Sequence, residues 1–249
     1  MALSLAQSAL AFAPALAPAA AATRAAAVQM VTPPATLTTL AKELNPVIGY
    51  WDPLGLGTAD FWSKGNDATV GFLRHAEIKH GRVAMAAFVG YIAQYNGLHW
   101  GFPMSLSGND PQYAAGLTPP EQWDALPMSA KIQILGFVGF LEFWGELGAS
   151  IGDNSHYMKG GKPGAYPEFP EANVIPFTPA GVLSLYDPFG FSKNKSDEAK
   201  AKGLLTEINN GRLAMIGIMG FLAEQKVPGS VPFGPKLSAY AGEVMAPLM

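Results

Sequence analysis

The chain of 249 residues contains no cysteine, which excludes disulfides, thiolate catalysis and metal sites built on cysteine. Charged residues are also scarce, at 14% of the chain against about 25% in typical soluble domains. The net charge is −3, so no basic surplus indicates nucleic acid as a partner. What remains is 49% hydrophobic with 28 glycines and 21 prolines, which indicates few regular elements joined by long irregular segments.

The first 30 residues differ in composition from the rest of the chain. They are rich in alanine, contain no acidic residue and carry Arg24 as their only charged side chain. Such acid-poor leaders are typical of organelle import, so we expect residues 1–30 to be a targeting leader that is removed. A disordered N-terminal tail is the alternative. In either case the folded domain is expected over residues 31–249.

A nine-residue motif occurs twice, 130 positions apart, as EIKHGRVAM at 77–85 and EINNGRLAM at 207–215. The register extends into the apolar stretch after each copy, where glycine and alanine recur at matching positions. It also includes the preceding loops, WDPLG at 51–55 and YDPFG at 186–190. Asp-Pro followed by Gly is ordinary turn chemistry, but its duplication in register suggests two equivalent pockets.

Three stretches have the length and apolar weight of long helices, at about 70–97, 129–151 and 200–226. None is an uninterrupted run of about 20 apolar residues, so a soluble helical bundle is the alternative to a membrane protein. Against that alternative, the apolar residues in the first and third stretches surround the helix and form no single stripe. Small residues also recur at a spacing that suits close helix packing in lipid. We therefore expect an all-α membrane protein with three transmembrane helices.

The loop charges predict an orientation. Residues 97–129 contain no Lys or Arg, whereas residues 152–202 contain six lysines. The positive-inside rule then places the N-terminus and the second connection on the same side of the membrane. With three spans, the first and third helices run in the same direction.

The charged residues of the motif cannot all pair within their own helix. Glu77 and Arg82 are five positions apart, about 140° around a helix, whereas helical ion pairs prefer a spacing of three or four. The repeat offers partners across two crossing helices: Arg82 with Glu207, and Arg212 with Glu77. The first and third helices are thus expected to cross as a pseudo-two-fold pair. These ion pairs stabilise such a bundle whether or not they have a second role.

Other polar residues in the helices indicate ligands for metals. His80 and Asn210 lie three positions after the two glutamates, on the same helical face. A bare Mg²⁺ ion needs about six oxygen ligands in one place, which single residues spread along three helices do not provide. Such a pattern suits a metal that a macrocycle already holds and that needs one protein ligand, and Mg²⁺ accepts oxygen ligands readily. Further candidates in apolar surroundings are Gln94, Gln133, Glu142 and Glu224.

The duplicated motif resembles the signature of the light-harvesting chlorophyll-binding protein superfamily, and the match covers roughly residues 45–226. The middle helix ILGFVGFLE at 134–142, the loop HYMKGGKPG at 156–164 and AFAP at 11–14 resemble the fucoxanthin-type chlorophyll a/c antennae of plastids. The resemblance implies chlorophyll a, chlorophyll c, and fucoxanthin-like or related carotenoids. It implies carotenoid ends near Asp52 and Asp187, and magnesium ligands at Glu77, His80, Gln133, Glu142, Glu207, Asn210 and Glu224. His75, His99 and His156 are either additional ligands or polar residues near helix ends.

The resemblance implies an antenna protein that passes excitation energy to a photosystem, and not an enzyme. The expected location is the plastid thylakoid membrane, as a multi-pass protein with its N-terminus on the stromal side. The expected partners are a photosystem I or II core, other antenna subunits and thylakoid lipids, with no nucleic acid. A photoprotective quencher of the same family is the alternative, with Asp110, Glu121 and Asp124 as lumen-facing acidic residues. A small membrane transporter is a distant alternative.

Overall fold

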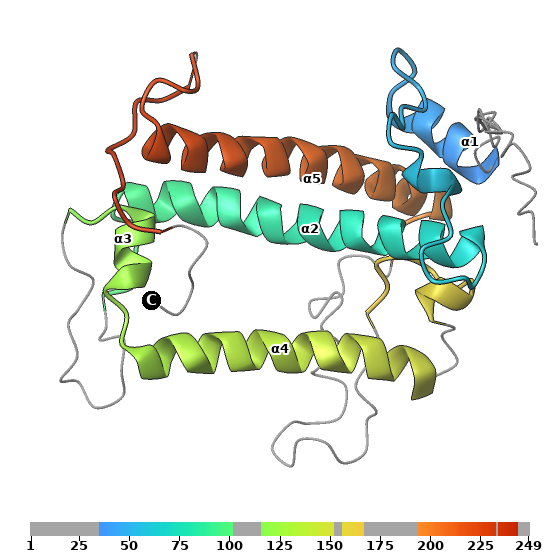
Figure 1. Cartoon of the computed structure of the whole chain (residues 1–249), viewed down its shortest axis with the longest axis horizontal. Coiled ribbons are helices and arrows are strands. Elements are labelled where there is room, and N and C mark those ends of the chain that lie inside the picture. The colour runs from blue at the N-terminus through green and yellow to red at the C-terminus, as the bar shows by residue number, and fades with distance from the viewer. Residues whose placement is uncertain (1–34, 102–115, 152–155, 167–193, 233, 244–249) are drawn as a thin grey trace, which may run out of the picture. The chain divides into compact units, whose positions relative to one another are not determined.

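The computed structural model describes residues 35–101, 116–151, 156–166, 194–232 and 234–243. The contacts divide the chain into two units, residues 1–32 and 33–249, and all described residues belong to the second. Only helices and no strands occur in these ranges, which confirms the all-α class. Figure 1 shows the elements α1 (Ala35–Leu44), η1 (Leu56–Thr58), α2 (Asn66–Tyr95), α3 (Pro119–Asp124), α4 (Met128–Ile151), η2 (Tyr157–Lys159) and α5 (Asp197–Lys226).

The three long helices α2, α4 and α5 lie where the sequence pattern predicts helices, with shifted starts. α5 begins at Asp197 because the Ser196 side chain accepts a hydrogen bond from the backbone N–H of Ala199, a distance of 3.3 Å. Acidic residues in its first turn also favour this start. The short helices α1 and α3 have no counterpart in the sequence prediction. The predicted leader, residues 1–30, lies outside the described residues.

Among the described residues, no helix combines the length and the apolarity that crossing a membrane requires.

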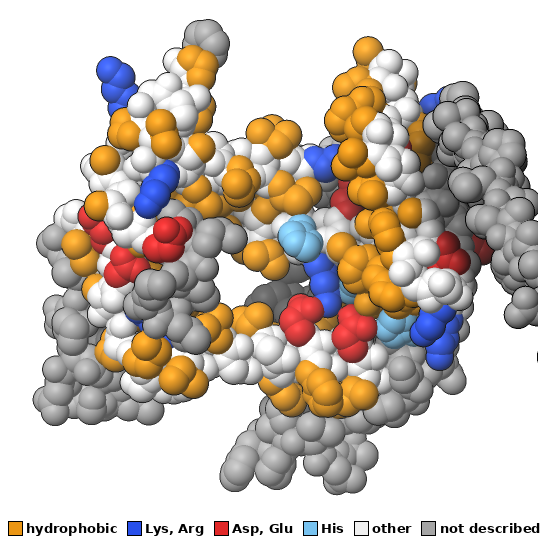
Figure 2. All heavy atoms as spheres, viewed as in Figure 1, with side chains coloured by type: hydrophobic (Ala, Val, Ile, Leu, Met, Phe, Trp, Pro, Cys, Tyr) orange, Lys and Arg blue, Asp and Glu red, His pale blue; other side chains and the backbone are white. Residues whose placement is uncertain are grey.

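Large hydrophobic side chains are exposed on all three long helices, as the space-filling view shows (Figure 2). On α4, Phe137 and Phe143 are both 63% exposed. On α5, Leu213 is 69% and Ile216 72% exposed. Exposure of this extent indicates interaction surfaces on the long helices.

α2 and α5 lie side by side (Figure 1). Two glycines of the repeat meet where the helices approach most closely. A Cβ atom added to Gly81 would lie 3.1 Å from the Cα atom of Gly211, so the backbones approach too closely for any larger residue. Tyr91 and Phe221, also related by the repeat, have ring centroids 5.0 Å apart. Because the repeat-related residues meet in pairs along both helices, α2 and α5 run in the same direction.

α4 is joined to α2 by polar side chains and by the segment 156–166, and not by close backbone packing. Tyr166 donates from its hydroxyl to the carbonyl oxygen of Leu141 at 3.0 Å. At the C-terminal ends of α2 and α5, residues 234–243 connect α5 with α3. There the Tyr240 hydroxyl donates to Asp124 at 2.7 Å, and its backbone N–H donates to Gln225.

Candidate functional site

Two reciprocal ion pairs hold the crossing of α2 and α5. Arg82 Nε donates to Glu207 Oε1 at 2.6 Å, and Arg212 Nε donates to Glu77 Oε1 at 2.7 Å. Each pair is interhelical, because the five-residue spacing separates the glutamate and arginine of one helix. The side chains of Glu77 and Glu207 remain 23% and 29% exposed, respectively. Each glutamate therefore gives one oxygen to an arginine of the other helix and keeps a second oxygen that accepts no hydrogen bond within the described residues.

The two pairs differ in their surroundings. Arg82 Nη1 also donates to the carbonyl oxygen of Gly164 at 2.6 Å, so the segment 156–166 contacts one side of the crossing. Arg74 Nε lies 3.7 Å from Glu77 Oε2, which brings a second cation near that carboxylate. The repeat places Leu204 at the position equivalent to Arg74. The environments of Glu77 and Glu207 are thus chemically distinct.

The side chains of His80 and Gln133 are each oriented by a contact with the backbone carbonyl oxygen four residues earlier. His80 Nδ1 lies 2.8 Å from the carbonyl oxygen of Ala76, so Nδ1 carries the proton and Nε2 keeps its lone pair. Gln133 Nε2 donates to the carbonyl oxygen of Ser129 at 3.2 Å, which turns Oε1 outward. Both side chains are exposed. Asn210 is exposed as well, and its side chain makes no hydrogen bond within the described ranges.

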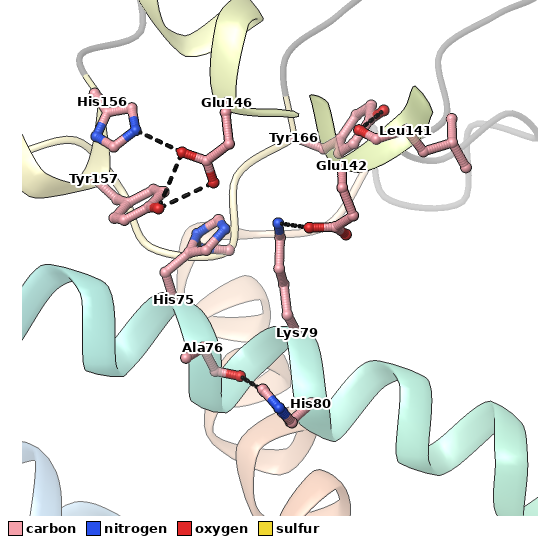
Figure 3. A network of polar contacts seen from close by, with 11 residues as sticks. His75, Ala76, Lys79, His80, Leu141, Glu142, Glu146, His156, Tyr157 and Tyr166 are labelled. Atoms are coloured by element: carbon pink, nitrogen blue, oxygen red, sulfur yellow. Dashed lines mark hydrogen bonds and ion pairs between the residues drawn. The ribbon is translucent and has the colours of Figure 1, made fainter. Parts of the chain in front are cut away.

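Figure 3 shows that Lys79 and His75 point from α2 toward residues of α4 and the following segment, whereas His80 points elsewhere. The Lys79 ammonium contacts Glu142 Oε2. Glu142 thereby resembles Glu77 and Glu207, since one of its oxygens meets a cation from another helix. The side chain of Glu142 is 58% exposed, which leaves its other oxygen accessible.

His75 belongs to a different cluster. Its Nδ1 accepts a hydrogen bond from the backbone N–H of Gly164 at 3.1 Å, so its proton is on Nε2. Its ring stacks on Tyr157 with centroids 4.0 Å apart. His156 contacts Glu146 through Nε2 and accepts from the backbone of Met158 through Nδ1. Neither histidine has a lone pair directed outward for a metal, which favours their interpretation as polar residues near helix ends.

Glu224 caps a turn beyond the third helix. Its two carboxylate oxygens accept hydrogen bonds from the backbone N–H groups of Gly229 and Val231 at 2.9 and 3.0 Å. The residue is only 5% exposed. The adjacent Gln225 is still more buried, and Gln94 of α2 is half-buried. The Glu224 carboxylate thus holds the turn that follows α5 in place.

Asp52 likewise organises its own loop. It accepts hydrogen bonds from the backbone N–H groups of Leu56 and Gly57, and from the hydroxyl of Tyr50 at 2.9 Å. Burial raises the pKa of the Asp52 carboxyl, but these hydrogen bonds outweigh that effect, so the pKa lies below its ordinary value. Asp187, the equivalent residue of the second loop, lies outside the described residues.

These groups fit metals that macrocycles hold. The described part of the chain contains no group of three or more His, Asp or Glu side chains that could hold a bare metal ion. The accessible donors are separate: carboxylate oxygens at Glu77, Glu207 and Glu142, and Nε2 of His80. Each can supply the one axial ligand that a magnesium–macrocycle complex lacks.

Several residues of this site were not identified by the sequence reasoning. Lys79, Glu146, Tyr157 and Gly164 make contacts between segments that have no repeat-related counterpart. Lys79 is replaced by Asn209 in the second copy of the motif, but His80 and Val83 are replaced there as well, so this difference alone does not single out Lys79.

Comparisons with known proteins agree with the motif. The family model for chlorophyll A-B binding protein matches residues 33–226. A chloroplastic fucoxanthin-chlorophyll a-c binding protein of Trieres chinensis is 33% identical over 193 residues, which cover 76% of this chain and 79% of that protein. Protein A of Macrocystis pyrifera, with the same description, is 32% identical over 72% of this chain and 69% of its own length. Protein B of Phaeodactylum tricornutum is 30% identical over 72% and 75%, respectively.

Proposed function

Because the chain belongs to the chlorophyll a-b binding protein family, we propose that it is a light-harvesting antenna of the plastid thylakoid membrane. Its pigments are chlorophyll a, chlorophyll c and a fucoxanthin-type carotenoid. The relatives, which are chloroplastic fucoxanthin-chlorophyll a-c binding proteins, support both the pigment class and the plastid.

The reciprocal ion pairs are the observation that carries this proposal. An uncompensated carboxylate in an apolar environment would be costly, and a carboxylate with both oxygens occupied could not bind a metal. Glu207 shares one oxygen with Arg82, and Glu77 shares one oxygen with Arg212 while Arg74 Nε lies 3.7 Å from its other oxygen, beyond hydrogen-bond distance. The second oxygen of each glutamate would then bind a chlorophyll magnesium.

The proposed ligand set follows from the accessible donors. It consists of the carboxylates of Glu77, Glu207 and Glu142, the Nε2 atom of His80 and the side-chain oxygens of Gln133 and Asn210. Glu224 is left out, because both of its oxygens accept backbone hydrogen bonds. Asp52 folds the loop before η1, and we propose this loop and its counterpart around Asp187 as the regions that meet the carotenoid ends.

When bound, the pigments supply light absorption and excitation transfer, while the chain's residues fix their positions. The i−4 carbonyl contacts of His80 and Gln133 orient their donor atoms before any ligand is present. Close contact at Gly81 and Gly211 fixes the crossing, and therefore the spacing between the ligands of α2 and α5. No bond is made or broken in this function, so we propose no enzymatic activity.

The exposed apolar faces support insertion of α2, α4 and α5 as three transmembrane helices. Phe137 on α4 and Ile216 on α5 have no apolar protein neighbours that cover them, and pigment tails and thylakoid lipids would do so. Contacts between repeat-related residues support α2 and α5 as a pseudo-two-fold pair with an axis along the membrane normal. The lysines of residues 152–202 support a stromal N-terminus.

The partner that receives the excitation is proposed to be a photosystem core, with other antenna subunits alongside. A quenching function regulated by lumenal acid has less support. Glu121 forms a capping box with Thr118. The hydrogen bond that the backbone N–H of Thr118 donates to the Glu121 carboxylate holds the pKa of that carboxyl below its ordinary value. A carboxylate of that kind stays ionised under mild acidification and is a poor sensor.

The proposal is tested by the fluorescence excitation spectrum of the protein purified from its native membrane in mild detergent. Chlorophyll emission excited by carotenoid-absorbed light is the expected result, since an antenna couples both pigments. A stable, correctly folded protein without pigment would contradict the proposal.

A further inference from the structure

The contact between Lys79 of α2 and Glu142 of α4 has no counterpart elsewhere in the repeat. On α4 itself, the only Lys or Arg is Lys131, which is far from Glu142 along the helix. One turn after Glu142 lies Glu146, a second carboxylate and therefore an unfavourable neighbour. The cation that neutralises Glu142 must come from another element, and Lys79 provides it.

The same arrangement occurs at three carboxylates. Glu77 meets Arg212, Glu207 meets Arg82, and Glu142 meets Lys79, each cation coming from a different helix than the carboxylate. In each case one carboxylate oxygen contacts the cation from the other helix, and the second oxygen accepts no hydrogen bond within the described residues, although Arg74 lies 3.7 Å from that of Glu77. Lys79 thus pairs with the glutamate of α4 as the two arginines pair with the glutamates at the crossing of α2 and α5.

The difference between the two motif copies agrees with this role. The residue equivalent to Lys79 on α5 is Asn209, whose Nδ2 donates to the carbonyl oxygen of Leu44 in α1 at 3.2 Å. At that position α5 has α1 as its neighbour, so no carboxylate of α4 needs a cation there. Lysine is present only in the copy whose helix contacts α4.

Other contacts hold α4 independently of Lys79. Tyr166 donates to the carbonyl oxygen of Leu141, the residue before Glu142, and its ring lies near Gly145. Tyr157 donates to both oxygens of Glu146, at 3.0 and 3.1 Å (Figure 3). These bonds fix the register of α4, so loss of the lysine is not expected to detach the helix.

We propose that Lys79 is the positioning residue for a chlorophyll held by Glu142. Its ammonium binds one carboxylate oxygen of Glu142 and leaves the second oxygen for the magnesium. The inference rests on the proposed function. It adds a requirement for a matched pair: a carboxylate at this position is held by the cation, whereas an amide oxygen needs no cation.

The test uses variants of the full chain refolded with a pigment extract that contains chlorophyll a, chlorophyll c and carotenoid. Glu142→Leu removes the ligand, Lys79→Met removes the cation, and Lys79→Arg keeps the charge. The double variant Lys79→Met/Glu142→Gln removes both charges but retains an amide oxygen as a ligand. Pigments per chain are counted in an organic extract, and helix content is measured by far-ultraviolet circular dichroism.

We expect Glu142→Leu and Lys79→Met each to lose one chlorophyll per chain with unchanged helix content. Lys79→Arg and the double variant should retain it, and the loss of pigment at unchanged helix content in Lys79→Met separates a positioning role from a merely structural one. If Lys79→Met retains every pigment, or the double variant loses as much as Lys79→Met, the positioning role is overturned. If Glu142→Leu retains every pigment, Glu142 is no ligand and the inference is overturned. In both cases the proposed function stands as long as the wild-type chain binds chlorophyll; a wild-type chain that binds none overturns both.

Discussion

Replacement of Gly81 by alanine tests the close crossing of α2 and α5 at its narrowest point. The added methyl would lie 3.1 Å from the Cα atom of Gly211, which is backbone and cannot turn away as a side chain would. Gly90 on the same helix is the matched control, because a Cβ atom there meets nothing within 4 Å. The two substitutions are chemically identical and differ only in the space around them.

The expected magnitude follows from two terms. Replacing glycine by alanine inside a helix stabilises by about 1 kcal/mol at either position. Overpacking at Gly81 adds a cost of about 1–3 kcal/mol, because the helices must separate to admit the methyl. The difference between the two variants cancels the first term and leaves the second. For a chain of this size it corresponds to a difference in melting temperature of roughly 2–4 °C per kcal/mol.

The assay is thermal unfolding of both pigment-loaded variants, followed by circular dichroism and by release of chlorophyll. Gly81→Ala is expected to melt several degrees below Gly90→Ala and to release chlorophyll earlier, since separation of the helices lengthens both interhelical ion pairs. Equal melting temperatures for the two variants would refute the close crossing.

Three further results are expected. Glu77→Leu should lose a chlorophyll and lower the melting temperature, because an arginine also loses its partner. His80→Leu should lose a chlorophyll with little change in melting temperature. Pigment counts and melting curves check both variants, and a full pigment count in either would exclude that residue as a ligand. Asp52 has a lowered pKa, so its contribution to stability is complete above the ordinary carboxyl range and is lost as pH falls through the lowered value. Protection of the amides of its loop, measured relative to their exchange rate in an unstructured peptide, should be lost only at strongly acidic pH, and loss of protection near neutrality would contradict the assigned hydrogen bonds. Burial and Glu146 raise the pKa of Tyr157 to about 12, so its hydroxyl still donates at alkaline pH. Tyr157→Phe should lower the free energy of unfolding by about 1 kcal/mol in denaturant titrations. An unchanged unfolding midpoint would argue against the hydrogen bonds from Tyr157 to Glu146.

The crossing of the first and third helices could be predicted from the sequence because the motif is duplicated. The spacing of Glu77 and Arg82 excludes a pair within the helix, and the second copy supplies the alternative partners. The structure joins the same residues, Arg82 with Glu207 and Arg212 with Glu77. When a motif is duplicated, the spacing within one copy can therefore predict a contact between distant segments.

Contacts that occur once in the chain could not be predicted in this way. Nothing in the spacing of Lys79 indicates Glu142, and nothing near His75 indicates the backbone of Gly164. The prediction for Glu224 had a different limit. Its apolar surroundings and the resemblance suggested a ligand, but the turn that follows α5 supplies N–H groups for both of its oxygens. The conformation of that turn decides the role of Glu224, and the helical pattern does not contain it.

Extraction and chromatography of the pigments from the protein, purified in mild detergent from its native membrane, tests the central claim most directly. The ion-paired carboxylates and the oriented His80 predict bound chlorophyll a together with chlorophyll c and a fucoxanthin-type carotenoid. Chlorophyll b with lutein would contradict the pigment class, and a protein that carries no pigment would contradict the function of every ligand proposed above.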